Sequence, residues 1–184
     1  YFLVHNVIGH VVNFTENTDT VMADMIDVSP TMFHAVPRIW EKYYSGIIIR
    51  IDDATWLKRN LYHLAVKIGT AYNELILQRK KPSLGLTIAY KLAYFTVFWK
   101  LKKRLGFDRM RLGVSAAAPI SHNILKFFQS MGIPIREGYG LTETTGGTHM
   151  SDLNNFKLGY VGKALPGTEV KIAEDGEILV KHNA

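Results

Sequence analysis

Short apolar segments alternate with amphipathic ones along much of this chain, and that alternation constrains the fold more than any other feature. The pattern predicts strands near 11–15, 31–36, 111–115 and 133–138, with helices between them. A helix between two strands returns the chain to the same end of the sheet, so such strands run parallel. We therefore expect an α/β protein whose mainly parallel sheet is flanked by helices.

The last part of the chain has a different pattern. Glu174-Asp175-Gly176 separates two short alternating segments, which predicts an antiparallel hairpin over 169–181. A hairpin does not continue a strand–helix alternation. We therefore expect an α/β subdomain at 1–160 and the start of an adjoining β subdomain at 161–184.

Composition narrows the possible functions. The chain has no cysteine, which excludes disulfides, thiolate metal sites and a cysteine nucleophile. Of its 22 Lys and Arg, 11 lie in 56–104, a region that we expect to be helical and that holds one acid, Glu74. Such a block can contact an anionic membrane, bind a phosphate-bearing ligand or form a solvated helical face. No nucleic-acid-binding motif accompanies it, so we expect no nucleic acid partner.

An apolar stretch lies inside this basic region. Residues 82–99 carry a single charge, Lys91, near their middle. A charge at that position disfavours a membrane span, and the stretch is expected to form a buried or interfacial helix. The basic tracts Arg79–Lys81 and Lys100–Arg104 bracket it, and we expect them to form a basic surface.

Two loops carry the residues with the most chemistry. Ser115–Pro119 and Gly138–Thr144 each follow a predicted strand, and ligands of open α/β sheets bind at that edge. The first loop is built from very small residues, which let a flat ring approach the backbone. In the second loop Tyr139 offers a stacking face, Thr142 a hydroxyl and Glu143 a carboxylate for Mg²⁺. One helix separates the two strands, so we expect the loops to lie side by side.

These motifs resemble a known family. Gly138–Thr144 (GYGLTET) and Ser115–Ser121 (SAAAPIS) are similar to motifs of the AMP-forming adenylate-forming superfamily, which includes acyl-CoA synthetases and firefly luciferase. Val36–Lys42 (VPRIWEK) resembles the long-chain and very-long-chain acyl-CoA synthetases. Val161–Lys163 and Leu165–Gly167 resemble the stretch that follows in the same enzymes. The resemblance extends along the whole chain in the expected order.

The resemblance implies roles for individual residues. The adenine would be lined by Ala116, Ala117, Ala118, Pro119, Gly138, Tyr139, Gly140 and Leu141. Thr142 would contact the α-phosphate and Glu143 the Mg²⁺ ion. Ala116 departs from the family, which usually has Gly at that position, and its methyl group could crowd the purine or be absorbed by a small shift.

The resemblance also points to residues for the acyl group. Trp40 matches the position of an aromatic gate on the fatty-acid tunnel of some long-chain members, and a core Trp under the sheet is an equal alternative. His5 corresponds to a His near the acyl carboxylate. The phosphate loop would precede Tyr1, and the domain with the catalytic Lys would follow Ala184. We therefore expect the isolated chain to be inactive.

The resemblance predicts a fragment of a long-chain fatty acid–CoA ligase. The parent would use ATP, releasing AMP, with Mg²⁺ and with coenzyme A as co-substrate, on a fatty acid. We expect a cytoplasmic protein, with peripheral membrane contact as an option. Two alternatives stay open: a fatty acyl-AMP ligase that loads a carrier protein, and a non-catalytic basic helical module that binds membranes or partners.

Overall fold

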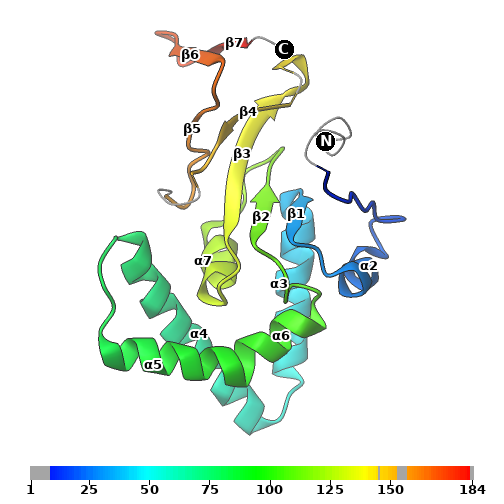
Figure 1. The fold of residues 1–184 in the computed structure, drawn as a ribbon, viewed down its shortest axis with the longest axis vertical. Coiled ribbons are helices and arrows are strands. Elements are labelled where there is room, and N and C mark those ends of the chain that lie inside the picture. The colour runs from blue at the N-terminus through cyan, green and yellow to red at the C-terminus, as the bar shows by residue number, and fades with distance from the viewer. Residues whose placement is uncertain (1–8, 145, 153–156, 183–184) are drawn as a thin grey trace.

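The computed structural model describes residues 9–144, 146–152 and 157–182 (Figure 1). Its elements in chain order are α2 (Val21–Val28), β1 (Met32–Ala35), α3 (Pro37–Asp52), α4 (Trp56–Leu77), α5 (Leu84–Ala93), the π-helix η1 (Tyr94–Phe98), α6 (Trp99–Arg104), β2 (Leu112–Ser115), α7 (His122–Ser130), β3 (Ile135–Leu141), the 3-10 helix η2 (Thr142–Thr144), β4 (Gly146–Met150), β5 (Lys163–Ala164), β6 (Thr168–Ile172) and β7 (Ile178–His182).

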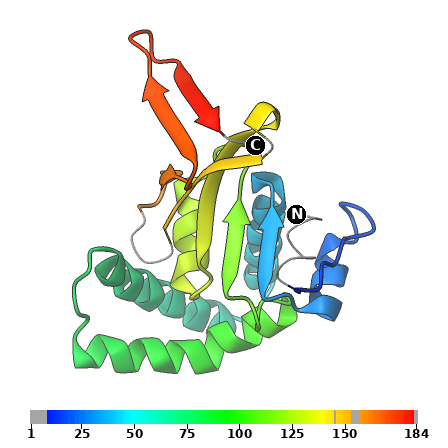
Figure 2. The same ribbon diagram turned by 45° about the horizontal axis from the view of Figure 1, so that its top comes forward.

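A five-stranded sheet with the order β1-β2-β3-β4-β5 organises the fold. β1, β2 and β3 run parallel, and β4 and β5 extend the sheet antiparallel. Helices α3 and α7 lie against one face of the parallel strands (Figure 2). Helices α4, α5 and α6 form a layer at the end of the sheet where these strands begin (Figure 1). The α/β fold class with a mainly parallel sheet is confirmed.

Most of the predicted elements are present. Strands near 31–36, 111–115 and 133–138 are confirmed as β1, β2 and β3, and the expected hairpin is the separate β6–β7 sheet. The helical region breaks between Asp52 and Trp56 and again between Leu77 and Leu84. Ser83 caps α5 by accepting a hydrogen bond from the N–H of Leu86 at 3.2 Å. The division of the chain near residue 160 stays a prediction.

The strand expected at 11–15 is wrong. Residues 11–15 form no strand, and the side chains of Val11 and Phe14 are exposed. Strand propensity expresses how well a side chain fits a pleated, half-buried surface, and it has effect only where a neighbouring strand supplies that surface. No described strand pairs with this segment, so its β-branched composition alone does not produce one.

The loop expected over Gly138–Thr144 is wrong in its first part, which is a strand. β3 continues to Leu141, η2 turns the chain, and β4 returns antiparallel beside it. Glycine is usually depleted from strands, which is why the segment resembles a loop. Here Gly140 permits a close approach, because a Cβ atom at that position would collide with the backbone carbonyl of Gly146.

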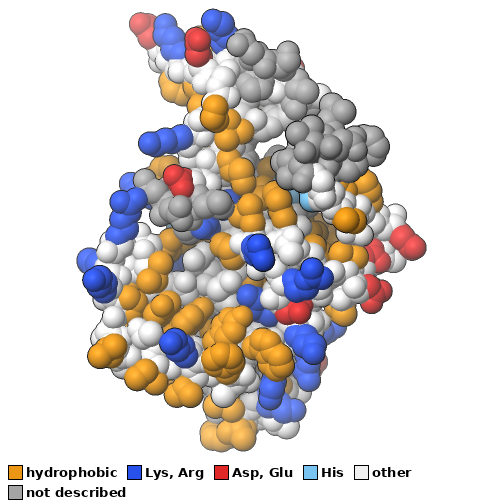
Figure 3. All heavy atoms as spheres, viewed as in Figure 1, with side chains coloured by type: hydrophobic (Ala, Val, Ile, Leu, Met, Phe, Trp, Pro, Cys, Tyr) orange, Lys and Arg blue, Asp and Glu red, His pale blue; other side chains and the backbone are white. Residues whose placement is uncertain are grey.

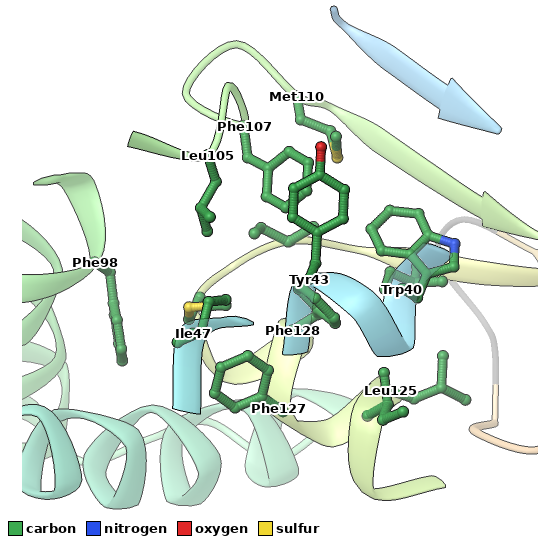
Figure 4. Close-up of a cluster of buried hydrophobic side chains, with 14 of the residues drawn as sticks. Trp40, Tyr43, Ile47, Phe98, Leu105, Phe107, Met110, Leu125, Phe127 and Phe128 are labelled. Atoms are coloured by element: carbon green, nitrogen blue, oxygen red, sulfur yellow. The ribbon is translucent and has the colours of Figure 1, made fainter. Parts of the chain in front are cut away.

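The core lies between the sheet and helices α3 and α7. Aromatic rings from three segments meet there: Trp40 is 5.3 Å from Phe128, and Tyr43 is 4.7 Å from Phe107, between ring centroids (Figure 4). Gly113 on β2 leaves room for the Trp40 indole, since a Cβ atom there would lie 2.8 Å from the ring. The spacing of large side chains along α3 thus places them directly beneath the small residues of β2.

Two further findings concern the helical layer. Among the described helices, none is both long and apolar enough to cross a membrane.

The expectation that all of Lys100–Arg104 forms a basic surface is wrong for Lys102, which is buried and donates to the carbonyl of Gly132 at 3.4 Å. Its position one turn after the buried Phe98 directs it inward. Burial lowers the pKa of the Lys102 amine below its ordinary 10.5, against the charge of Asp108.

Candidate nucleotide site at the sheet edge

The two predicted loops lie together at the carboxyl edge of the parallel strands. Ser115 at the end of β2 pairs with Glu137 on β3, so Ala116, which leaves the sheet after β2, lies beside Gly138, which continues β3. A Cβ atom built on Gly138 would lie 3.7 Å from the Cβ of Ala116. The expected adjacency of Ala116–Pro119 and Gly138 onward is confirmed, and their roles toward a nucleotide stay predictions.

The first loop forms a low shelf with little side-chain bulk. Ala117, Ala118 and Pro119 are exposed, and Ala116 is half-buried. Ala117 has φ 75°, in the left-handed region that disfavours any residue with a Cβ atom. A left-handed alanine turns the chain sharply over the end of β2, and the shelf presents backbone atoms to a ligand.

The second motif is a strand that becomes a tight turn. Gly138, Tyr139 and Gly140 are half-buried on β3, while Leu141 and the η2 residues Thr142 and Glu143 are exposed. Hydrogen bonds between residues of the turn stabilise it. The Thr144 hydroxyl accepts from the N–H of Leu141 at 3.2 Å and lies 3.0 Å from the Leu141 carbonyl oxygen. The oxygens of Thr142 and Glu143 therefore project from a fixed turn at the edge of the sheet.

The β3–β4 pairing brings in two residues that the sequence analysis did not identify. His149 faces Tyr139 across the strands, with ring centroids 5.6 Å apart in an edge-to-face arrangement. The buried Thr148 hydroxyl lies 3.0 Å from Nδ1 of His149 and 3.3 Å from the carbonyl oxygen of Tyr139. A register shift after Tyr139 makes Thr148 the extra residue of a bulge. The sequence could have indicated these two residues only if the β3–β4 hairpin had been predicted.

Polar groups beneath the edge hold it in place. The Glu137 carboxylate accepts from the N–H of Gly159 at 2.7 Å, which ties the later chain to β3. Arg136 is buried, and burial lowers its pKa to about 10 against the charge of Asp152, so it stays cationic at neutral pH. The Ser115 hydroxyl is buried with no hydrogen-bond partner among the described residues. It is a free polar group directly before the alanine shelf.

The remaining predicted residues lie elsewhere. Trp40 is fully buried in the aromatic core under β2, as the core alternative expected, and the gate role stays a prediction. His5 lies outside the described residues. The structure therefore brings the residues expected to bind the nucleotide to one sheet edge, and it places Trp40 in the core beneath β2.

The edge fits an adenine nucleotide with Mg²⁺ in its chemistry. It offers exposed backbone for a flat ring, a Tyr face beside it, and hydroxyl and carboxylate oxygens on the turn. No group of three His, Asp or Glu residues within the described chain could hold a metal by itself. Mg²⁺ is commonly held by one or two carboxylates together with phosphate oxygens. Glu143 therefore suits an ion that is shared with a phosphate.

Comparison with known proteins places this edge in a family. The chain matches the family of AMP-binding enzymes over residues 2–184. The chain belongs to the AMP-binding enzyme family. A long-chain-fatty-acid–CoA ligase, FadD15 of Mycobacterium bovis, is 34% identical over 170 residues, which is 92% of this chain and 28% of that protein. The human long-chain-fatty-acid–CoA ligase ACSBG2 is 34% identical over 148 residues, 80% of this chain and 22% of that protein.

The chain therefore spans less than a third of each of these relatives. Among solved structures, the anthranilate CoA ligase AuaEII in complex with anthranoyl-AMP matches 92% of this chain with 25% of its own. The TM-score is 0.50 at 15% sequence identity, a likeness of fold alone. The sheet and its helices thus have an arrangement like that of a quarter of this ligase.

Proposed function

We propose that the chain is the central part of a long-chain fatty acid–CoA ligase. The observation that carries the proposal is the meeting of Ala116–Pro119 with Gly138–Glu143 at one sheet edge. The long-chain substrate rests on the relatives' names and their identities of about a third. In this proposal an acyl-adenylate is the first product.

In the proposed first step, the fatty acid carboxylate attacks the α-phosphorus of ATP. An oxygen–phosphorus bond forms and the bond to pyrophosphate breaks. The alanine shelf and Tyr139 hold the adenine, and the Thr142 hydroxyl donates to an α-phosphate oxygen, where charge develops. Glu143 holds Mg²⁺, which offsets the phosphate charge when bound. His149, packed against Tyr139, limits the tilt of the Tyr ring.

In the second step, the coenzyme A thiol attacks the acyl carbonyl and AMP leaves. A relative that stops at the acyl-adenylate and loads a carrier protein uses the same edge, so the acceptor is the finer part of the proposal. The relatives' names favour coenzyme A. The parent is proposed to work in the cytoplasm and to touch membranes peripherally through its basic region.

The direct test supplies the purified parent protein with ATP, Mg²⁺ and palmitate, and follows pyrophosphate and products by mass spectrometry. We expect palmitoyl-AMP without coenzyme A, and palmitoyl-CoA with AMP when coenzyme A is added. Thr142→Val should slow both by about 100-fold. Palmitoyl-AMP that persists after coenzyme A is added would favour the carrier-loading alternative, and no adenylate at all would contradict the ligase.

The chain of 184 residues provides the matching control. Supplied with the same reagents, it should release no pyrophosphate above background, because the phosphate loop and the catalytic lysine are expected in the rest of the parent. Activity from this chain alone would show that its own residues suffice for adenylation.

A further inference from the structure

The helical layer presents two exposed apolar stripes. On α4 the stripe consists of Leu57, Leu61 and Leu64, at the spacing of one helix face. On α5–η1–α6 it consists of Ile88, Leu92, Phe95 and Trp99 at similar spacing. Figure 3 shows hydrophobic side chains gathered over this lower part of the molecule, with Lys and Arg among them. Exposed apolar side chains that gather in one place with polar residues around them mark an interaction site.

The two stripes border one groove. A cavity of about 230 Å³ lies between the helices, lined by Leu64, Ala65, Ile68, Ala89, Leu92, Ala93 and Thr96. The lining has one hydroxyl, on Thr96, and that hydroxyl donates to the Leu92 carbonyl at 2.7 Å. The groove therefore offers no free side-chain donor, and its natural occupant is a hydrocarbon group.

Cations border the apolar surface. Lys91 and Lys100 are exposed next to stripe residues, and the Nζ of Lys103 lies 5.7 Å from the centroid of the Trp99 ring. Glu74 is the sole acid in 56–104 and forms an ion pair with Lys126 at 3.5 Å. Three cations thus border the α5–η1–α6 stripe, and the one acid within 56–104 is already paired.

We propose that this surface docks on an anionic lipid bilayer. The apolar stripes and the groove between them meet the upper acyl chains, Trp99 lies at headgroup depth, and Lys91, Lys100 and Lys103 contact lipid phosphates. A second copy of the chain is a poor occupant, since pairing two such faces would place cations against cations. The proposal specifies the membrane contact of the proposed function, yet its test needs no enzymatic activity, so either can fail alone.

The three tryptophans make the test direct. Trp99 is 45% exposed on the surface and Trp56 is 70% exposed at the start of α4, while Trp40 is fully buried in the core. Vesicles of phosphatidylglycerol with phosphatidylcholine should shift the emission of Trp56→Phe to the blue, and brominated lipid should quench it. The Trp99→Phe, Trp56→Phe double variant, with Trp40 alone, should show neither change. Equal responses of both variants would overturn the placement of Trp99.

Matched substitutions distinguish vesicle binding through this surface from nonspecific adsorption. Leu92→Glu should weaken binding to anionic vesicles by about tenfold or more. Ile172→Glu, on β6, is the control, because Ile172 is 61% exposed and Leu92 62%. Gln at both Lys100 and Lys103 should weaken binding by about 30-fold at low salt, with Lys102 left intact. Equal losses for Leu92→Glu and Ile172→Glu would overturn the proposal.

Three further measurements test the proposed docking on an anionic bilayer. Equal binding to vesicles of pure phosphatidylcholine would show that lipid charge is not recognised. The parent protein is measured in parallel: if this chain binds vesicles and the parent does not, the face is covered by the rest of the parent and the proposal fails. Sedimentation velocity gives the third arm, since a dimer that Leu92→Glu converts to monomer would make a second copy the occupant. Vesicle binding by the parent that follows the predicted order of variants supports the proposal.

Discussion

The nucleotide edge and the helical layer lie at opposite ends of the parallel strands and are built on opposite principles (Figure 1). At the edge, the site is built from small residues: Gly140 allows the β3 and β4 backbones to approach closely, and Ala117 adopts a left-handed backbone conformation. In the helical layer the surface comes from long exposed side chains, such as Leu92 and Lys103. The first kind of site tolerates little change in volume, and the second should tolerate change in volume but not in polarity.

Adding one methyl group at the edge should have the largest effect. Gly140→Ala places a Cβ atom against the backbone carbonyl of Gly146, which only a backbone shift can relieve. We expect a loss of about 3 kcal/mol in the free energy of unfolding, measured with urea and Trp40 fluorescence. Gly147→Ala is the control, since a Cβ atom there meets nothing within 4 Å and should cost below about 1 kcal/mol. Equal losses would contradict the close crossing of β3 and β4.

Removing one charge from the edge should affect chemistry rather than stability. Glu143→Gln in the parent should slow pyrophosphate release with palmitate by about 100-fold, with excess Mg²⁺ restoring part of the loss. Glu143 is exposed, so the melting temperature should stay unchanged. Glu174→Gln, in the distant β6–β7 turn, should leave the rate as it is. A full rate for Glu143→Gln would remove this residue from the metal site.

A glycine on the shelf should stabilise the protein. Ala117 has φ 75°, and replacing it by Gly should add about 1 kcal/mol to the free energy of unfolding. Ala118→Gly is the matched comparison: its φ is not positive, so Gly there adds only chain entropy in the unfolded state and should cost about 1 kcal/mol. The same sign for both variants would show that the left-handed turn is not strained.

The buried amine of the helical layer predicts a small dependence on pH. Burial lowers the pKa of the Lys102 amine in the folded protein. At pH values between this lowered pKa and 10.5, the amine is therefore protonated to a greater extent in the unfolded chain than in the folded one. The Lys102 contribution to the free energy of unfolding therefore rises with pH across this window. Urea titrations should show this rise in Lys103→Met but not in Lys102→Met. Identical pH profiles of the two variants would contradict the burial of Lys102.

The two regions also differ in how well the sequence predicts them. The adjacency of the two segments is predictable because one helix separates β2 from β3, and because Gly138–Glu143 lies in a specific motif; the end of β3 at Leu141 is not predictable from the alternation. The sequence does not predict the β4 strand or the position of His149. The β3–β4 hairpin contains four glycines, which are typical of loops, and its pairing depends on tertiary contact. The segment 11–15 fails for the converse reason, since it has strand composition without a partner strand.

The helical layer is predictable in its boundaries but not in its faces. Breaks after α3 and before α5 follow from local signals such as Ser83. The inward position of Lys102 does not, because a run of basic residues does not reveal which one the helix turn directs to the core. A π-helix at Tyr94–Phe98 shifts the helix phase in this stretch, and the sequence carries no clear signal for it.

The central claim is that the sheet edge, and not the basic helical layer, binds the nucleotide. Photolabelling the parent with 8-azido-ATP and Mg²⁺, followed by peptide mass spectrometry, tests it directly. The account predicts adducts on peptides containing 116–119 or 138–144, and loss of the adducts when excess ATP competes. Competed adducts concentrated on the Lys and Arg peptides of 56–104 would contradict it.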